Sequence, residues 1–252
     1  MYLIGDIGNT DIKIFLFDKN YKVRKKLILK TNLISNNYLA SKLNFLTQHT
    51  NKIIKILFSS VVPSAFSTIK KFIKKNMKQS CVELKQIKLS KLVKIMVNKK
   101  QVGSDRLANA IGIIDKKTNY IILDFGTATT FDVVIKDKYL GGVIAPGVNL
   151  SLKTLISKAS LIPSINLSKV SKVVGTNTES AVKSGFYWGY SGLINNIILK
   201  IERETKKKYK IIFTGGYADL FKTSIIRSFE IDKNITIKGI IEIFKENRKY
   251  LN

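Results

Sequence analysis

Apolar and polar residues follow one another along the first part of the chain in short segments typical of strands and helices. Residues 3–7 predict a buried strand, and in residues 12–17 apolar side chains recur at every second position. In order, the patterns predict strands at 3–7, 12–17 and 21–30, a helix at 37–49, a strand at 53–59, a helix at 63–78 and a strand at 82–84. Three strands are thus followed by helix, strand, helix and strand.

The second part of the chain shows a similar succession of patterns. A helix carrying Leu107 and Ile111 precedes it. The patterns then predict strands at 120–124, 131–135 and 139–144, helices at 150–157 and 179–205, a strand at 210–214, a helix from about 219, a strand at 234–236 and a helix at 239–250. The order of elements in the second half therefore resembles that of the first.

A short motif occurs once in each half. Asp6-Ile7-Gly8 and Asp124-Phe125-Gly126 both end a predicted strand, and both lead into a second strand. An internal repeat of half a chain is evidence for a duplicated fold. We therefore expect an α/β protein with two similar lobes, residues 1–112 and 113–252, that face each other across a cleft.

The repeated motif has the chemistry of a phosphate-binding turn. Glycine lets the backbone approach a phosphate, and exposed N–H groups and the hydroxyls of Thr10 and Thr127 can bind its oxygens. An aspartate at the strand end can hold a cation, and Lys13 can add a positive charge. Either copy alone is equally well explained as an ordinary hairpin, but the matched pair favours phosphate binding.

A second group of residues, Gly103-Ser104-Asp105-Arg106, precedes an apolar helical pattern. Ser104 or Asp105 could serve only as the N-cap of that helix. The functional interpretation gives Asp105 the role of general base, with Arg106 binding an anionic substrate. Phosphoryl transfer requires such a base together with positioning and charge neutralisation.

The composition narrows the functional classes. The net charge is +27, from 44 basic and 17 acidic residues, but lysines are spread along nearly the whole chain. We therefore interpret the excess as compositional drift and solvated faces, and we expect no nucleic-acid partner. One cysteine and one histidine, His49, argue against disulfides and metal sites built from these residues. The start of the chain lacks a signal sequence and the apolar runs are short, so we expect a cytoplasmic protein without membrane spans.

Taken together, the motifs resemble type III pantothenate kinase, within the superfamily of actin, sugar kinases and heat-shock ATPases. The segments that carry the resemblance are Asp6 to Thr10 with Lys13, Gly103 to Arg106, Asp124 to Thr130, Gly141 to Gly147, Asn177 to Ser180 with Gly185, and Thr214 to Gly216. They follow the order of the family from residue 4 to about residue 240. The resemblance implies two ribonuclease-H-like lobes around a nucleotide cleft.

The resemblance also implies an activity and a set of roles. The reaction would convert ATP and pantothenate to ADP and 4′-phosphopantothenate, the first step towards coenzyme A, in a homodimer. Asp105 would be the catalytic base, and the substrate would contact Gly103, Ser104, Asp105, Arg106 and Thr178. ATP would bind Asp6, Ile7, Gly8, Asn9, Thr10, Asp11, Ile12, Lys13 and Thr127. Asp124 would bind potassium or ammonium, and Asp6 would lie near magnesium.

Two alternatives stay open. Residues 96–101 lack the tyrosine and proline that the family often has there, so a kinase of the same fold for another small alcohol is possible on sequence grounds. Ser104 replaces a commoner alanine. The other alternative is a non-catalytic accessory factor of the same fold with a regulatory role. The presence of Asp6, Asp105 and Asp124 favours the enzyme.

Overall fold

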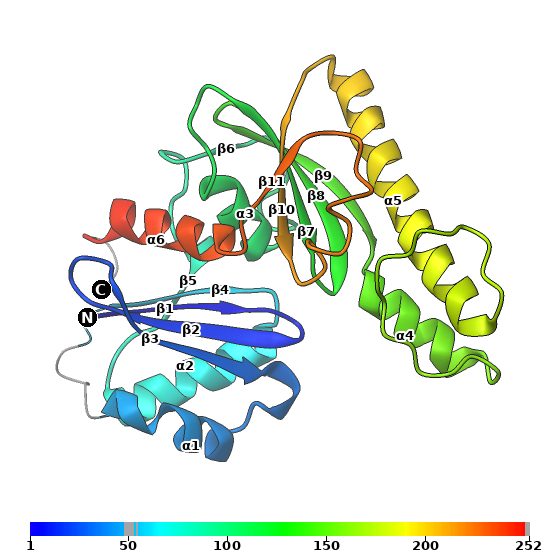
Figure 1. Cartoon of the computed structure of the whole chain (residues 1–252). Coiled ribbons are helices and arrows are strands. Elements are labelled where there is room, and N and C mark those ends of the chain that lie inside the picture. Colours follow the sequence, from blue (N-terminus) through cyan, green and yellow to red (C-terminus); the bar gives the residue numbers. More distant parts are fainter. Residues whose placement is uncertain (48–52, 54, 250–252) are drawn as a thin grey trace. The chain divides into compact units, whose positions relative to one another are not determined.

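The structure, a computed structural model, describes residues 1–47, 53 and 55–249 (Figure 1). His49 lies outside the described residues. The chain divides into two compact units, each of which is described by itself below. Unit 1 comprises Met1–Ile114, Asp137–Tyr139 and Asn234–Asn252, and unit 2 comprises Asp115–Lys136 and Leu140–Lys233.

Unit 1 is built on a five-stranded sheet with the order β3-β2-β1-β4-β5. Its elements are β1 (Tyr2–Ile7), β2 (Asp11–Phe17), β3 (Val23–Lys30), α1 (Asn36–Thr47), β4 (Lys55–Ser60), α2 (Pro63–Met77) and β5 (Val82–Glu83). The central strand β1 is antiparallel to β2 and parallel to β4. The predicted order of three strands, helix, strand, helix and strand is confirmed.

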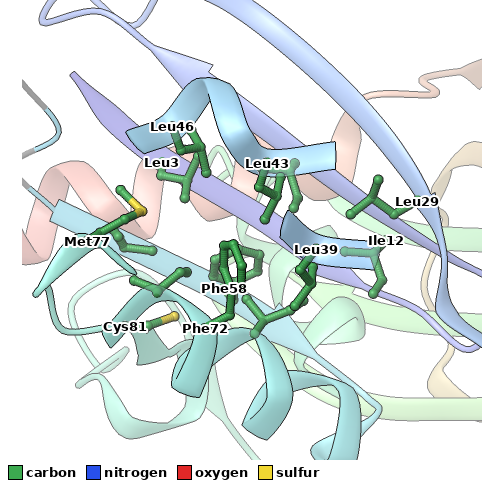
Figure 2. Packing of buried hydrophobic residues seen from close by; sticks show 14 of the residues in the cluster. Leu3, Ile12, Leu29, Leu39, Leu43, Leu46, Phe58, Phe72, Met77 and Cys81 are labelled. Carbon is green, nitrogen blue, oxygen red and sulfur yellow. The ribbon is translucent and has the colours of Figure 1, made fainter. Parts of the chain in front are cut away.

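Helices α1 and α2 cover one face of this sheet and enclose an apolar core (Figure 2). Alternate residues of the strands, such as Leu3 and Ile12, point into the core, where they meet Leu43 of α1 and Phe72 of α2. Each fully buried side chain of this kind contributes about 1.5–3 kcal/mol to stability. Pro63 occupies the first turn of α2, where its missing N–H is not needed.

Helices α3 (Ser104–Ile111) and α6 (Ile235–Asn247) also belong to unit 1 and contact the sheet through β4 and β1. They cross so closely that a Cβ on Gly239 would lie 1.8 Å from the carbonyl oxygen of Ala108. The rings of Tyr2 and Phe244 are 4.8 Å apart. This packing groups the last helix of the chain with unit 1, whereas we had expected it in a lobe of residues 113–252.

Unit 2 contains the second sheet, in which β7 is antiparallel to β8 and parallel to β10. The order is β11-β10-β7-β8-β9, and the first residues of β9 pair with β6 (Lys94–Ile95) within unit 1. The elements are β7 (Asn119–Phe125), β8 (Ala128–Ile135), β9 (Lys138–Pro146), α4 (Val148–Lys158), α5 (Thr178–Thr205), β10 (Lys210–Gly215) and β11 (Phe229–Ile231).

Two predicted elements near the C-terminus are wrong. Residues 216–228 form turns and bends rather than a helix from 219, although Ala218 and Phe221 are buried in the core of unit 2. The β-branched run at 234–236 predicted a strand, but Ile235 begins α6 and is fully buried. Packing of α6 against α3 therefore overrides the local strand propensity.

No helix among the described residues combines the length and the apolar character that crossing a bilayer requires.

Candidate active site

In unit 1, three polar side chains form a row across neighbouring strands. Asp6 on β1 is the register partner of Lys13 on β2 and of Ser59 on β4. Register partners point to the same face of a sheet, so these three side chains share one face, with Asp6 on the middle strand. Ser59 is fully buried, and its Oγ has no hydrogen-bond partner among the described residues.

Hydrogen bonds within the turn and from Thr31 hold the turn between β1 and β2, and two of its residues are exposed. Gly8 N–H donates to the Asp11 carbonyl at 3.0 Å. Thr31 donates its N–H to the Thr10 carbonyl at 3.0 Å and its hydroxyl to the Gly8 carbonyl at 2.7 Å. Because Asn9 and Thr10 are exposed, the turn is a preorganised surface on which an anion could bind.

The second group of candidate residues forms the N-terminus of α3. Gly103 is the N-cap, and the Asp105 carboxylate accepts the N–H of Arg106 at 2.8 Å. A Cβ on Gly103 would lie 2.4 Å from Asp105 Oδ1, so glycine leaves room for this carboxylate. Ser104 is fully buried and donates its hydroxyl to Glu83 at 2.5 Å. The Asp105 side chain is thereby fixed at the start of a helix.

Burial raises the pKa of the Asp105 carboxyl, because desolvation disfavours its charged form. The N–H of Arg106 and the positive charges of Arg106 and Lys85 oppose this rise. A carboxylate with a raised pKa is a stronger base than an ordinary aspartate, which is what a general base requires.

Val61 connects the two groups of unit 1. Its N–H donates to the Ile7 carbonyl at 3.0 Å, directly after the end of β4. Its Cγ1 would lie 3.4 Å from a Cβ on Gly103. The structure therefore brings the β1–β2 turn and the start of α3, residues 103–106 (the Asp105 turn), to the same edge of the sheet, where the parallel strands β1 and β4 end.

Unit 2 contains a matching row of polar residues. Asp124 on β7 is the register partner of Thr130 on β8 and of Thr214 on β10. Gly126 N–H donates to the Ala128 carbonyl at 3.0 Å and closes a tight turn, in which Thr127 is exposed.

Glycines allow the chain to pack closely around this second turn. Gly215 has a φ of +85°, and a Cβ there would lie 2.6 Å from both the nitrogen and the oxygen of Phe125. A Cβ on Gly147 would lie 2.1 Å from the Thr127 carbonyl oxygen. Both positions therefore require glycine, one because of its backbone conformation and both because of crowding.

Thr178 lies on a different element of unit 2, the first turn of α5. Asn177 caps this helix by accepting the Ser180 N–H at 2.8 Å, and Ser180 reciprocates in a capping box. Thr178 is exposed, and the structure does not place it in the turn that contains Asp124 and Thr127.

The carboxylates of Asp6 and Asp124 suit cations that take most of their ligands from phosphate and water. Among the described residues, no three histidine, cysteine or acidic side chains are grouped closely enough to hold a metal ion. Magnesium in nucleotide sites usually has one or two protein carboxylates and completes its shell with phosphates and water. A single carboxylate at Asp6 and another at Asp124 are compatible with this mode of binding, and not with an all-protein cage.

Comparison with known proteins decides the family. The family model for type III pantothenate kinase matches residues 2–200. The type III pantothenate kinase of Pelagibacter ubique is 56% identical over 241 residues, which cover 96% of this chain and 97% of that one. The chain belongs to the type III pantothenate kinase family.

Solved structures with low sequence identity show the same fold. One is a conserved protein of Campylobacter jejuni, described as a candidate Baf family transcriptional activator, with a TM-score of 0.61 at 21% identity, covering 98% of this chain and 99% of that one. Another is a polyphosphate/ATP-glucomannokinase of Arthrobacter, with a TM-score of 0.51 at 14% identity, covering 97% and 98%. These likenesses agree with the predicted duplicated fold of actin and sugar kinases.

The chain also has an apolar groove in unit 2. It measures about 420 Å³ and lies between α4 and α5. Its lining consists mainly of apolar and small side chains: Pro146, Ser151, Leu155, Val182, Gly185, Phe186, Gly189, Tyr190 and Leu193. Tyr190 crosses from α5 to α4 and donates a hydrogen bond to Ser151 at 2.7 Å.

Sequence reasoning missed two polar residues of unit 1 that flank the candidate site. Ser59 was noted only as the end of a strand, and its place beside Asp6 follows from a parallel pairing across 53 residues, which no local pattern reveals. Glu83 had a signal that could have been used. It is the only acidic residue between Asp18 and Asp105 in a strongly basic stretch.

Proposed function

We propose that this chain transfers the γ-phosphate of ATP to the primary hydroxyl of pantothenate, with Asp105 as general base. The observation that supports this most directly is the geometry of unit 1. A carboxylate with a raised pKa lies at the start of α3, and the start of α3 lies at the same edge of the sheet as the β1–β2 turn.

The residues divide the work of phosphoryl transfer between positioning and proton transfer. Residues Asp6 to Lys13 bind the ATP phosphates through the β1–β2 turn and the Lys13 ammonium, and Thr127 supplies a further hydroxyl. Asp105 accepts the proton of the attacking hydroxyl. Arg106 and Thr178, with Gly103 and Ser104, line the pantothenate site.

The carboxylates of Asp6 and Asp124 have different cations in this proposal. Asp6 lies next to Lys13 and faces the magnesium that accompanies ATP, largely through water. Asp124 has hydroxyl-bearing neighbours in its row, and it holds potassium or ammonium. When bound, such cations neutralise the charge that develops on the phosphate oxygens.

We propose further that the chain forms a homodimer through the α4–α5 groove. An exposed apolar groove of this kind is typical of a surface that another protein covers. Replacing Gly189 by tryptophan would fill the groove, and light scattering should then show a monomer where the unaltered protein is a dimer. A dimer of unchanged mass would show that the contact lies elsewhere.

The basic charge and a cytoplasmic location are both consistent with the proposed reaction. Positions 19–82 contain many basic residues and no acidic one, which favours the approach of anionic substrates such as ATP. We assign no nucleic-acid or membrane partner, and we place the protein in the cytoplasm, where ATP and pantothenate are available.

The test of this function is turnover of pantothenate by purified, folded protein with magnesium and ATP in potassium, ammonium or sodium salt. We expect 4′-phosphopantothenate only with potassium or ammonium. Phosphorylation of a different small alcohol alone would identify a kinase of the same fold with another substrate. Nucleotide binding without any turnover would favour the non-catalytic accessory factor.

A further inference from the structure

Glu83 lies at the end of β5, and both oxygens of its carboxylate are engaged. Oε1 accepts the hydroxyl of Ser104 at 2.5 Å, and Oε2 accepts the N–H of Lys85 at 2.7 Å. Its own N–H donates to Gln86 at 3.2 Å, which completes a capping box. A carboxylate that accepts hydrogen bonds at both oxygens has little freedom to move, so the Glu83 side chain is held in one position.

Ser104 links the Glu83 carboxylate to the proposed base, Asp105. It is the first residue of α3, is fully buried and directly precedes Asp105. The N-cap of α3 is Gly103, whose missing side chain cannot cap the helix. The start of α3 is therefore tied by Ser104 to a neighbouring element and not by a cap of its own.

The same corner of β5 also holds the segment that leads into the Asp105 turn. Lys99 Nζ donates to the carbonyls of Lys85 and Ile87, each at 3.0 Å. Lys85 Nζ donates in turn to the Lys100 carbonyl at 3.3 Å. Residues 96–101 are thus attached to the residues that follow Glu83, so this corner holds both Ser104 and the segment that leads into the Asp105 turn.

We propose that Glu83 is a positioning residue for phosphoryl transfer, which acts by holding Ser104 and thereby the Asp105 carboxylate. This inference rests on the proposed role of Asp105 as base. The Ser104 hydroxyl is donated to Glu83 and so acts through Asp105, in addition to the place that the proposed function gives this residue in the substrate site. A displacement of about 1 Å in a reacting group can cost about 100-fold in rate, so a hydrogen bond outside the reacting centre can matter for turnover.

The experiment compares Ser104→Ala and Glu83→Ala with their double variant and with Gln86→Ala. Gln86→Ala removes the reciprocal half of the capping box and leaves the Glu83–Ser104 bond in place. Initial rates give kcat and KM for both substrates, and titration with ADP counts the competent sites in each preparation.

We expect kcat per competent site to fall about 10-fold in Ser104→Ala and at least as much in Glu83→Ala, because Asp105 loses its fixed geometry. KM for ATP should not change. The double variant should be no worse than Glu83→Ala, since both changes remove one interaction. Glu83→Gln, which keeps one acceptor oxygen, should recover part of kcat, and Gln86→Ala should match the unaltered protein.

A purely structural role would lower the melting temperature and the number of competent sites but leave kcat per site unchanged, and that result would overturn the inference. Asp105→Asn separates this failure from failure of the proposed function. If Asp105→Asn is inactive while Ser104→Ala is normal, only the role of Glu83 is wrong. If Asp105→Asn is fully active, the base itself is misassigned.

Discussion

The polar rows of the two units share a scaffold and differ in chemistry. In each unit the next-to-last residue of a central strand is an aspartate, and the strand has an antiparallel partner on one side and a parallel partner on the other. Ser59 and Thr214 occupy equivalent positions on the parallel strands. On the antiparallel strands the equivalent positions carry Lys13 in unit 1 and Thr130 in unit 2.

This difference indicates how a duplicated fold can acquire two roles. The scaffold places a carboxylate at the same point twice, and the neighbouring side chain then sets the local charge. In the proposed function, the lysine beside Asp6 helps to bind phosphate, whereas the hydroxyls in the row of Asp124 suit a cation site. Unit 1 alone adds the Asp105 turn. The account therefore assigns the base, phosphate binding and magnesium to unit 1, and the monovalent cation to unit 2.

The largest effect is expected at the residue that has no counterpart in unit 2. Asp105→Asn should lower kcat about 10²–10⁴-fold, the usual contribution of a general base. Because the change leaves the β1–β2 turn intact, ATP binding measured by calorimetry should be preserved. Turnover within a few-fold of the unaltered protein would remove Asp105 from the mechanism.

A smaller effect on activity is expected at the position where the two polar rows differ, Lys13 in unit 1 and Thr130 in unit 2. Lys13→Met keeps the length of the side chain and removes its charge, which should raise KM for ATP about 10- to 100-fold, the value of a hydrogen bond to a charged group. The matched variant Thr130→Val should change KM for ATP much less. Equal effects would show that the rows are not differentiated in the way proposed.

A third variant pair tests why unit 2 needs glycine where unit 1 has serine. Gly215 pairs with Phe125 as Ser60 pairs with Ile7. Gly215→Ser should destabilise the protein by about 2–4 kcal/mol in urea unfolding, since φ is positive and the new Cβ meets the backbone of Phe125. The reverse change, Ser60→Gly, should cost only about 0.5–1 kcal/mol.

The smallest effect is a pH dependence of stability that unit 1 owes to Asp105. Its raised folded pKa means that the protonated form is favoured by folding. This contribution is complete below the ordinary pKa of 3.8 and is lost as the pH rises through the folded value. Asp105→Asn should therefore raise the melting temperature slightly at pH 7 and not at pH 3. The acid limb of kcat should lie above pH 3.8 in the unaltered protein.

Much of unit 1 could be predicted from the sequence, because its elements carry strong local patterns. The alternation in β2 and the helical spacing in α2 belong to contiguous residues, and the Asp-x-Gly repeat marked both turns. Thr127 and Asp124 were found together for the same reason.

The rest depends on contacts between residues far apart in the chain. Ser59 reaches Asp6 only through parallel pairing, and Glu83 reaches Ser104 across 21 residues. Ile235 begins a helix because it packs in unit 1, against the strand propensity of its own segment. Local patterns contain no information about such partners, so these contacts were visible only in the folded chain.

The measurement that tests the central claim most directly is cation dependence in Asp124→Asn and Asp6→Asn. Pantothenate phosphorylation is followed as potassium replaces sodium at constant ionic strength, and then as magnesium is varied. The account predicts that Asp124→Asn loses its response to potassium, while Asp6→Asn still responds to potassium and needs more magnesium. An unchanged potassium response in Asp124→Asn would contradict the division of roles between the two units.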